Sequence, residues 1–514
     1  MNIDMGPVLG FRGIQRGKWQ LSALFVSKGG GTPRALTVRD GGPPRDIVNP
    51  SLLKSFAGRR VWRYDFDVRQ SGEARKVEYE LGAPNRKKNT FSVPAAGSAP
   101  RIAYASCNGF SDPRDMKKVD DQHDRWTHMA EKHGTDPYNL LVMGGDQVYA
   151  DSIWETVPSL KEWAEKPAEK RNEAPYSRAI RDAVEAFFME LYCSCWAQPK
   201  PAEMFASIPN LMMWDDHDIF DGWGSYSKDQ QESRVYQGIF RTAREYFAIF
   251  QQRVKPGGKP AGGLPGQNHF NYLHDFGDIA LLALDMRSER SQTQVLGSRS
   301  WKAVYAALDG LARRKHKHLF VLSSIPVVHP DFSMVETGFG ILPGQQALED
   351  DLKDHWHSRS HKVERLRLIH RLLQFAEKKE TRVTLLSGDV HVGAVGVIES
   401  QRAGSMNNHA NVINQLTSSG IVHPAPPALM SYALEFLSRK PEQVDRGITA
   451  SLLEFHGMRR RFIMARNWLG LEPDASGGRI WANWYVEGEE ERYTKVIHPV
   501  EVPVADETAE ARPN

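Results

Sequence analysis

The chain has 514 residues, of which 40% are hydrophobic, enough for two or three globular domains with sizeable cores. Lys and Arg total 66 and Asp and Glu total 63, so the formal net charge is only +3. This small charge argues against a dedicated nucleic-acid-binding or membrane-surface protein. It does not exclude a local basic patch on the surface. No apolar run is long enough for a transmembrane helix, so we expect none.

The cysteines and the N-terminus bear on the cellular compartment. Cys107, Cys193 and Cys195 are too few and too unevenly placed for a disulfide framework, so the chain is compatible with a reducing compartment. Residues 1–6 lack a basic region followed by an apolar core, and they contain no twin arginine. We therefore expect a cytoplasmic protein. The sequence leaves its oligomeric state open.

Short alternating strand patterns dominate the first hundred residues, as at 19–26 and 61–68. Residues 29–33 and 39–50 are rich in Gly and Pro and predict loops. These patterns predict an N-terminal β-sandwich-like module over residues 1–98.

After this module, strand and helix patterns alternate, which indicates an α/β layered domain over residues 99–500. The predicted helices cover 120–133, 177–196, 231–253, 298–315, a charged region at 345–380, and 428–438. The predicted strands cover 209–214, 278–285, 319–323, 394–399 and 412–419, with a terminal hairpin at 479–486 and 493–498. Ser177 is suited to cap the second helix, and residues 501–514 predict a disordered tail.

Four stretches share one layout, in which an apolar strand ends in polar side chains. They are 102–108, 140–151, 211–218 and 383–391. Functional groups of open α/β sheets gather beyond the carboxyl ends of the strands, so we expect these side chains to form one site. The candidate residues are Cys107, Asp146, Tyr149, Asp216, His217, Asp389 and His391.

This set of side chains suits metal ions. Carboxylates favour hard cations such as calcium or magnesium, whereas a thiolate or phenolate beside a carboxylate and a histidine favours a transition metal, ferric iron in particular. A carboxylate that bridges two cations can hold them roughly 3.5–4 Å apart, where they clamp the attacking and leaving oxygens of a phosphoryl transfer. The sequence therefore predicts at least two metals.

In this order, Ser106-Cys107-Asn108, 145–149, 214–218 and 387–391 resemble the alkaline phosphatase D (PhoD) family of calcineurin-like metallophosphatases. The resemblance covers about residues 101–420. It implies layered β-sheets flanked by helices, with an N-terminal β module. The spacing of Asp146 and Tyr149 also resembles that of purple acid phosphatases, in which an Asp and a Tyr three residues later bind iron.

The resemblance implies a metal content and roles for individual residues. Ferric iron is expected at Cys107, Asp146, Tyr149 and His391. Calcium is expected nearby, with Asp146 bridging the iron and the calcium and with Asp216 and Asp389 as further calcium ligands. Other divalent cations are alternatives to calcium. The resemblance also places His217 and Arg287 beside the phosphate.

The sequence departs from the family at two points. It lacks the twin-arginine signal of the exported enzymes. Asp389 stands where many relatives have His, and Asp216 where they have Asn, which favours calcium over zinc at the second metal.

We therefore predict a metal-dependent phosphoester hydrolase, a phosphatase or phosphodiesterase, in which a metal-bound hydroxide attacks phosphorus at a binuclear or trinuclear site. The alternative is a catalytically inactive binding or regulatory protein with the same fold.

Several residues also have plainer interpretations. The alternative for Cys107 is a small buried thiol, and the alternative for Arg287 is a structural ion pair with a carboxylate. The alternative for His217 is a residue that orients a metal ligand. His316 and His318 flank lysines and predict a surface position, whereas His329 and His423 follow strands and are alternatives for approaching the cleft. The role of residues 425–469 is left open.

Overall fold

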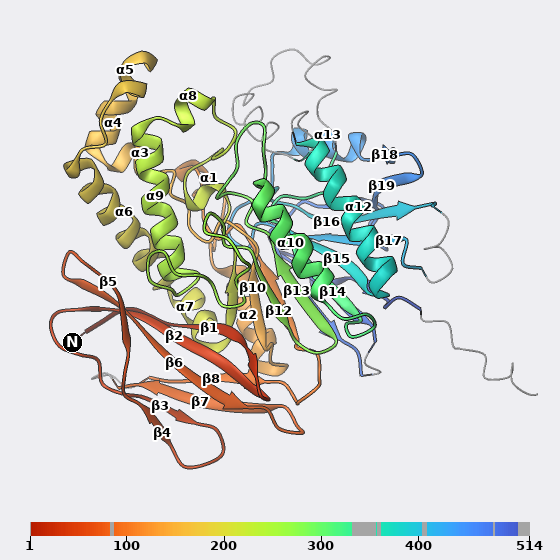
Figure 1. Ribbon diagram of the computed structural model, residues 1–514, viewed down its shortest axis with the longest axis horizontal. Helices are drawn as coiled ribbons and strands as arrows, with labels where there is room; N and C mark the ends of the chain where they lie inside the picture. The colour runs from red at the N-terminus through yellow and green to blue at the C-terminus, as the bar shows by residue number, and fades with distance from the viewer. Residues whose placement is uncertain are drawn as a thin grey trace, which may run out of the picture.

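The computed structural model describes residues 2–82, 87–330, 356, 361–402, 409–475 and 478–501. Within this part of the chain, two large β-sheets and one small sheet are accompanied by helices (Figure 1). The helices are α1 (Pro113–Met116), α2 (Asp124–Thr135), α3 (Ile153–Thr156), α4 (Pro158–Ala164), α5 (Ala168–Glu173), α6 (Arg178–Trp196), α7 (Pro199–Ser207), α8 (Lys228–Gln231), α9 (Arg234–Phe250), α10 (Ser298–Gly310), α12 (Lys362–Lys379) and α13 (Ala428–Leu437).

The first large sheet has ten strands. In spatial order they are β23 (Tyr493–Ile497), β22 (Ile480–Val486), β21 (Asn467–Pro473), β9 (Ile102–Ala105), β10 (Leu140–Met143), β11 (Asn210–Met212), β1 (Asn2–Gln15), β2 (Lys18–Lys28), β6 (Arg59–Arg69) and β5 (Ser51–Phe56). Strands β9, β10 and β11 are parallel neighbours. They are flanked by β1, which runs parallel to β11, and by β21, which runs antiparallel to β9.

The second large sheet has nine strands. Along its main path they are β12 (Tyr272–Asp275), β13 (Ile279–Ala283), β14 (His318–Leu322), β15 (Arg382–Ser387), β17 (Val412–Thr417), β16 (Gly393–Ser400), β19 (Ile448–Leu453) and β18 (Glu442–Asp445), and β20 (Phe462–Ile463) pairs with β16. Strands β13, β14, β15 and β17 are parallel. The carboxyl ends of these strands therefore meet at one edge of the sheet.

The N-terminal region is β-rich, as the alternating patterns predict, and its strands are divided between two sheets. Strands β1, β2, β5 and β6 extend the ten-stranded sheet, because Gly10 of β1 pairs with Asn210 of β11. A separate four-stranded sheet has the order β4 (Arg45–Ile47), β3 (Leu36–Arg39), β7 (Arg75–Leu81), β8 (Lys88–Val93). Strand β4 lies in a segment predicted as a loop. The domain border after residue 98 stays a prediction.

The core follows from the two-residue period of the strands. On β14, Phe320 and Leu322 belong to the buried cluster shared with the ten-stranded sheet, whereas Leu319 and Val321 belong to a second cluster with α10 and α12. One face of the nine-stranded sheet therefore packs on the other sheet, and its opposite face is covered by helices. Figure 1 shows α10 and α12 lying across this sheet.

The predicted elements after residue 100 agree with the structure to within a few residues. The helix predicted over 231–253 is α9, and the terminal hairpin is formed by β22 and β23. Within the charged region 345–380 the structure describes α12, and most of residues 345–360 lie outside the described part, as do residues 502–514 of the predicted tail. His316 and His318, predicted at the surface, are each only 2% exposed, so that prediction was wrong.

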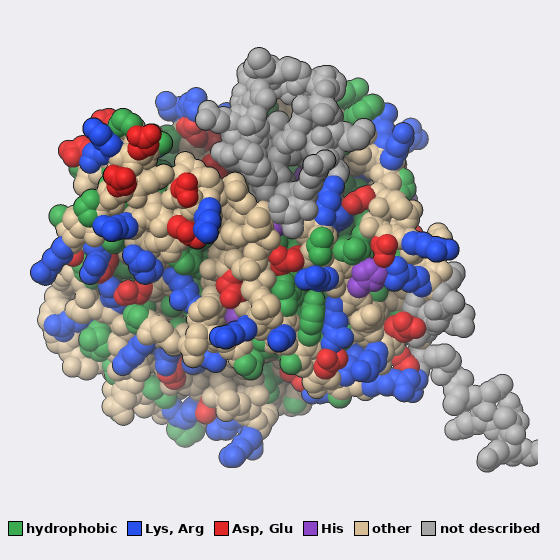
Figure 2. Space-filling model, turned by 45° about the horizontal axis from the view of Figure 1, so that its top comes forward, with side chains coloured by type: hydrophobic (Ala, Val, Ile, Leu, Met, Phe, Trp, Pro, Cys, Tyr) green, Lys and Arg blue, Asp and Glu red, His purple; other side chains and the backbone are tan. Residues whose placement is uncertain are grey.

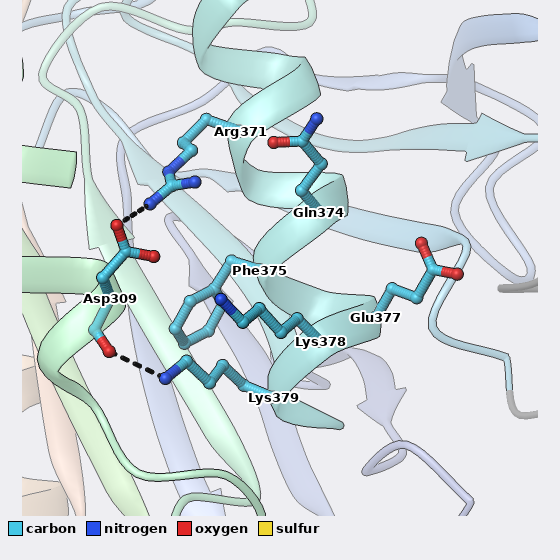
Figure 3. Close-up of a pocket in the computed structure, with 7 residues that line it drawn as sticks. All are labelled: Asp309, Arg371, Gln374, Phe375, Glu377, Lys378 and Lys379. Carbon is cyan, nitrogen blue, oxygen red and sulfur yellow. Dashed lines mark hydrogen bonds and ion pairs between the residues drawn. The ribbon is translucent and has the colours of Figure 1, made fainter.

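The outer surface adds two observations. Lys, Arg, Asp and Glu side chains are interspersed over the face shown in Figure 2, in keeping with the small net charge. A cavity of about 390 Å³ lies where α10 ends beside the last turns of α12 (Figure 3). There Arg371 pairs with Asp309 at 2.6 Å and the Lys379 ammonium donates to the Asp309 carbonyl at 2.8 Å, so the polar contacts of this cavity join two helices. No helix in the described ranges is long and apolar enough to cross a membrane.

The N-terminal cap of α6 gives a test of the fold. The Ser177 hydroxyl accepts the N–H of Ile180 at 3.2 Å, as predicted for a capping serine. We expect Ser177→Ala to lower the free energy of unfolding by about 1 kcal/mol, because one helix-terminal N–H loses its acceptor. Ser194→Ala, within the same helix, is the matched control. Equal denaturation midpoints for both variants would contradict the capping role.

Candidate metal centre

The carboxyl ends of the parallel strands of both large sheets converge at one place. The segment after β17 joins the segment after β9 through backbone hydrogen bonds, from Ile421 N–H to the Ser106 carbonyl at 3.1 Å and from His423 N–H to the Cys107 carbonyl at 3.2 Å. The segments after β9 and β10 are joined in the same way, from Asn108 N–H to the Asp146 carbonyl at 2.8 Å. Residues far apart in the sequence are thus brought together at the predicted edge.

Four carboxylates meet at this junction. Asp146 follows β10, Asp215 and Asp216 follow β11, and Asp389 follows β15; one oxygen from each lies within 4.8 Å of the others. A ring nitrogen of His217 also lies within this distance of oxygens of Asp146 and Asp216. These two groups include four of the predicted site residues, together with Asp215, which the sequence prediction omitted.

One cation of the protein itself lies among these carboxylates. Arg287 is fully buried, forms ion pairs with Asp215 and, at 3.2 Å, with Asp216, and lies 4.0 Å from Asp389. It also donates to the Trp223 carbonyl at 3.0 Å. The structure therefore brings Arg287 to the cluster, where the guanidinium is engaged by carboxylates of its own chain.

This charge balance fits bound cations. One guanidinium cannot neutralise the three buried carboxylates and the half-buried Asp389, and the Oδ1 atom of Asp146 has no hydrogen-bond partner in the described structure. Burial, followed by the neighbouring Cys107, raises the pKa of Asp146 well above its usual value. A cation at this position would offset the repulsion and provide Asp146 with a partner.

Cys107 lies against the same carboxylate. Its sulfur is 3.3 Å from Oδ2 of Asp146 and 3.0 Å from the Ser419 hydroxyl, and burial raises the pKa of the thiol. His391 has no hydrogen-bond partner for Nδ1 within the described structure, and its backbone N–H donates to Ser419 at 2.9 Å. Neither residue belongs to the two compact ligand groups, so the part of the site predicted to bind iron is the looser one in this structure.

Aromatic rings form a row beside the cluster. The ring centroids of His217 and Tyr149 are 4.4 Å apart, those of Tyr149 and His423 5.8 Å, and those of His423 and His391 3.7 Å, and each pair is stacked. Burial lowers the pKa of His423 to about 4, and burial, His423 and His217 lower the pKa of His391 well below its usual value. Both rings are therefore neutral at pH 7, the form that binds metals.

His217 has the opposite electrostatic environment. Burial alone would lower its pKa, but Asp151 and Asp216 raise it well above the usual value. The Nδ1 atom lies 2.8 Å from Oδ2 of Asp151, so this carboxylate fixes the orientation of the ring. The other ring nitrogen, Nε2, is left for a metal, a substrate or a proton transfer.

The backbone is unusual where the predicted ligands lie. Cys107, Asp146, Asp389 and His391 have φ angles of 56°, 53°, 68° and 54°, in the left-handed region that non-glycine residues rarely adopt. Such conformations persist where the surrounding structure enforces them, and they concentrate at functional sites. Four predicted ligands in this region on three different strand ends therefore support a common role.

Glycines allow the strand ends to approach so closely. A Cβ atom at Gly388 would collide with the Ser106 hydroxyl, and one at Gly145, where φ is 128°, would lie 2.8 Å from Cβ of Asp215. Only a residue without a side chain fits between these strand ends.

Four polar residues at the centre were not among the predicted site residues: Asp151, Asp215, Asp218 and Ser419. Asp218 accepts the N–H of Asp215 at 2.9 Å and that of Val148 at 3.3 Å, which ties two strand ends together. Asp151, Asp215 and Asp218 lie within the same predicted strand-end stretches, so the sequence pattern could have identified them as site residues. His423 was weighed as a residue that approaches the cleft, and it does so.

Comparisons with known proteins bear on the family and the fold. A family model described as PhoD related phosphatase matches residues 96–341 and 337–444. The uncharacterized protein YGR266W of Saccharomyces cerevisiae is 26% identical, over 80% of this chain and 71% of the yeast protein.

Two solved structures share the fold. The structure of PhoD has a TM-score of 0.58 at 13% identity and covers 96% of this chain and 90% of its own. A purple acid phosphatase, PPD1 from yellow lupin (Lupinus luteus) seeds, has a TM-score of 0.51 at 10% identity, with coverages of 96% and 74%.

These likenesses confirm the predicted mixed α/β fold of layered sheets flanked by helices, with a β-rich N-terminal region. The two parts matched by the family model together span residues 96–444, which include every residue of the carboxylate cluster. This chain belongs to the PhoD-related phosphatase family.

Proposed function

We propose that this protein is a metal-dependent phosphoester hydrolase that acts at the junction of the two sheets. The observation that carries the proposal is the convergence of Asp146, Asp215, Asp216 and Asp389, with one oxygen from each within 4.8 Å of the others. Family membership supports a phosphoester substrate. The proposal covers phosphatase and phosphodiesterase activity.

Two sets of side chains would hold the cations. Cys107, Asp146, Tyr149 and His391 offer thiolate, carboxylate, phenolate and imidazole donors suited to ferric iron. Asp146, Asp216 and Asp389 offer oxygens suited to calcium or another divalent cation. Such cations supply an activated water molecule and neutralise the charge that develops on the phosphoryl group.

The residues of the chain have distinct roles in this proposal. Arg287 keeps the Asp215 and Asp216 carboxylates in position through its ion pairs. His217, oriented by Asp151 and protonated at neutral pH through its raised pKa, donates a proton from Nε2 to the leaving oxygen of the ester. Asp151 is thus a positioning residue for His217.

Asp146→Asn tests the bridging carboxylate. We expect hydrolysis of aryl phosphates to fall at least about 100-fold, because a neutral amide is a poor ligand for two cations. The metal-free variant should unfold at the same or a higher denaturant concentration than the metal-free wild type, because a buried repulsive charge is removed. Added metal should stabilise the wild type and not the variant.

Asp182→Asn, at an exposed position of α6, is the control for Asp146→Asn and should resemble the wild type in all these measurements. Near-native turnover and metal content in Asp146→Asn would exclude the bridging role.

Metal analysis of purified protein tests the two sets of donors. We expect iron and a second, oxygen-preferring cation. Cys107→Ser should lose most of its iron, because a hydroxyl is a far poorer anionic ligand than a thiolate at neutral pH. Cys195→Ser, in α6 and outside both ligand groups, should retain it. Unchanged iron in Cys107→Ser, or zinc alone in the wild type, would contradict the proposed iron site.

The dependence on the leaving group tests His217. General acid assistance is typically worth on the order of 10²–10⁴-fold and matters most for a basic alkoxide. We therefore expect His217→Ala to slow hydrolysis of alkyl phosphates far more than that of p-nitrophenyl phosphate, with the metal content retained. Asp151→Asn should show the same pattern with smaller losses. Equal losses on both substrates would assign His217 to orienting the metal ligands.

A further inference from the structure

Helix α13 carries an apolar stripe that faces solvent. Leu429, Tyr432 and Phe436 are 61%, 69% and 59% exposed, and their spacing of three and four residues places them on one face of the helix. The helix itself is fixed to the protein, because Leu434 is buried and the Glu435 carboxylate accepts the backbone N–H groups of Arg461 and of Phe462, the first residue of β20. Large apolar side chains grouped in this way on an anchored helix mark an interaction surface.

Exposed basic residues lie beside this stripe. Arg439 and Lys440 follow α13, and Arg459 and Arg460 lie in the loop that the helix holds. None of the four forms an ion pair with a residue in the described ranges. The Arg439 guanidinium lies 5.7 Å from the centroid of the Phe436 ring, so positive charge and apolar surface are in direct contact.

Within the described part of the chain, the acidic residues in or next to these segments, Glu435, Glu442 and Glu454, each have a basic partner. Glu454 pairs with Arg461 at 3.0 Å, and Glu435 lies 4.0 Å from the same guanidinium. Glu442 pairs with Arg365 at 2.6 Å. The surface formed by α13 and residues 455–461 therefore carries a net positive charge around an apolar centre.

We propose that this surface docks the protein on an anionic lipid bilayer. The apolar stripe would enter the boundary between headgroups and acyl chains, with the Tyr432 hydroxyl at the polar level, while the four basic side chains contact lipid phosphates. An amphipathic surface of this kind binds peripherally and needs no membrane-spanning helix.

Two features favour a bilayer over a second copy of this chain. A symmetric dimer through α13 would bring the four unpaired cations of each copy against those of the other, which is unfavourable. The stripe also consists of three side chains on a ten-residue helix, whereas a stable protein interface buries roughly 800 Å² per partner. A bilayer needs no complementary pocket and supplies the opposite charge.

The surface is joined to the metal centre through one short loop. His423, which stacks on His391, is separated from α13 by residues 424–427. Docking does not require the metals, because neither the apolar stripe nor the four basic residues belong to the carboxylate cluster. Binding is therefore measurable without hydrolysis.

Sedimentation of the full-length protein with vesicles tests the proposal. We expect binding to vesicles of phosphatidylcholine with about 30% phosphatidylserine, weak binding to phosphatidylcholine alone, and a loss of binding as salt screens the charges. The double variant Tyr432→Ser/Phe436→Ser should bind roughly tenfold more weakly, and Arg459→Gln/Arg460→Gln should lose the preference for the anionic lipid.

Two matched controls remove similar groups elsewhere. Val48→Ser removes an equally exposed apolar side chain, 61% exposed, next to β4 at the opposite end of the molecule from α13 in Figure 1. Arg178→Gln removes an exposed charge at the start of α6. Both should bind anionic vesicles like the wild type, and thermal unfolding should show that all variants remain folded.

Three results would overturn the docking surface. One is no binding of the wild type to anionic vesicles, and another is equal binding by the wild type and the double variant. The third is a concentration-dependent dimer, detected by light scattering, that Tyr432→Ser/Phe436→Ser abolishes, because this result would assign the stripe to a second copy.

Discussion

Repulsion among buried carboxylates is the constraint on which the rest of this structure depends. Two like charges about 4 Å apart repel by about 4 kcal/mol at an effective dielectric constant of 20, a large share of the roughly 5–15 kcal/mol that stabilises a folded domain. Asp146, Asp215, Asp216 and Asp389 lie within this range of one another, and Arg287 offsets only part of the repulsion. The cluster is therefore stable only when bound protons or cations balance its negative charge.

Keeping such a cluster assembled requires a rigid frame, and the two sheets supply it. Each left-handed non-glycine residue costs roughly 1–3 kcal/mol, and four predicted ligands are of this kind. Backbone hydrogen bonds between the strand ends hold these conformations in place, since Ile421 and His423 of one sheet donate to carbonyls after β9 of the other. The extensive buried core thus compensates for strain that is confined to the strand ends.

Much of this arrangement was predictable because its signals are local. An apolar strand followed by Gly145 and Asp146 is visible within ten residues, and the family resemblance rests on four such short motifs in order along residues 101–420. The surface prediction for His316 and His318 was wrong: His318 shares one face of β14 with Phe320, and His316, which precedes the strand, is buried as well.

Contacts between distant segments left no such signal. The pairing of β1 with β11 and the stacking of His423 on His391 join residues that lie far apart or on different strands, and a single sequence does not encode that proximity in its period or spacing. The ion pairs of Arg287 with Asp215 and Asp216 are likewise contacts between distant segments, and the sequence alone does not identify these two partners.

The flanking of β9, β10 and β11 has a consequence for biosynthesis. One neighbour, β1, spans Asn2–Gln15, and the other, β21, spans Asn467–Pro473, so β21 is synthesised long after β1. The sheet that presents Asp146, Asp215 and Asp216 therefore cannot close until β21 has been translated, and β9 has an open edge until then. Nascent chains should depend on chaperones over this interval, and a product truncated before β21 should be a substrate for proteolysis.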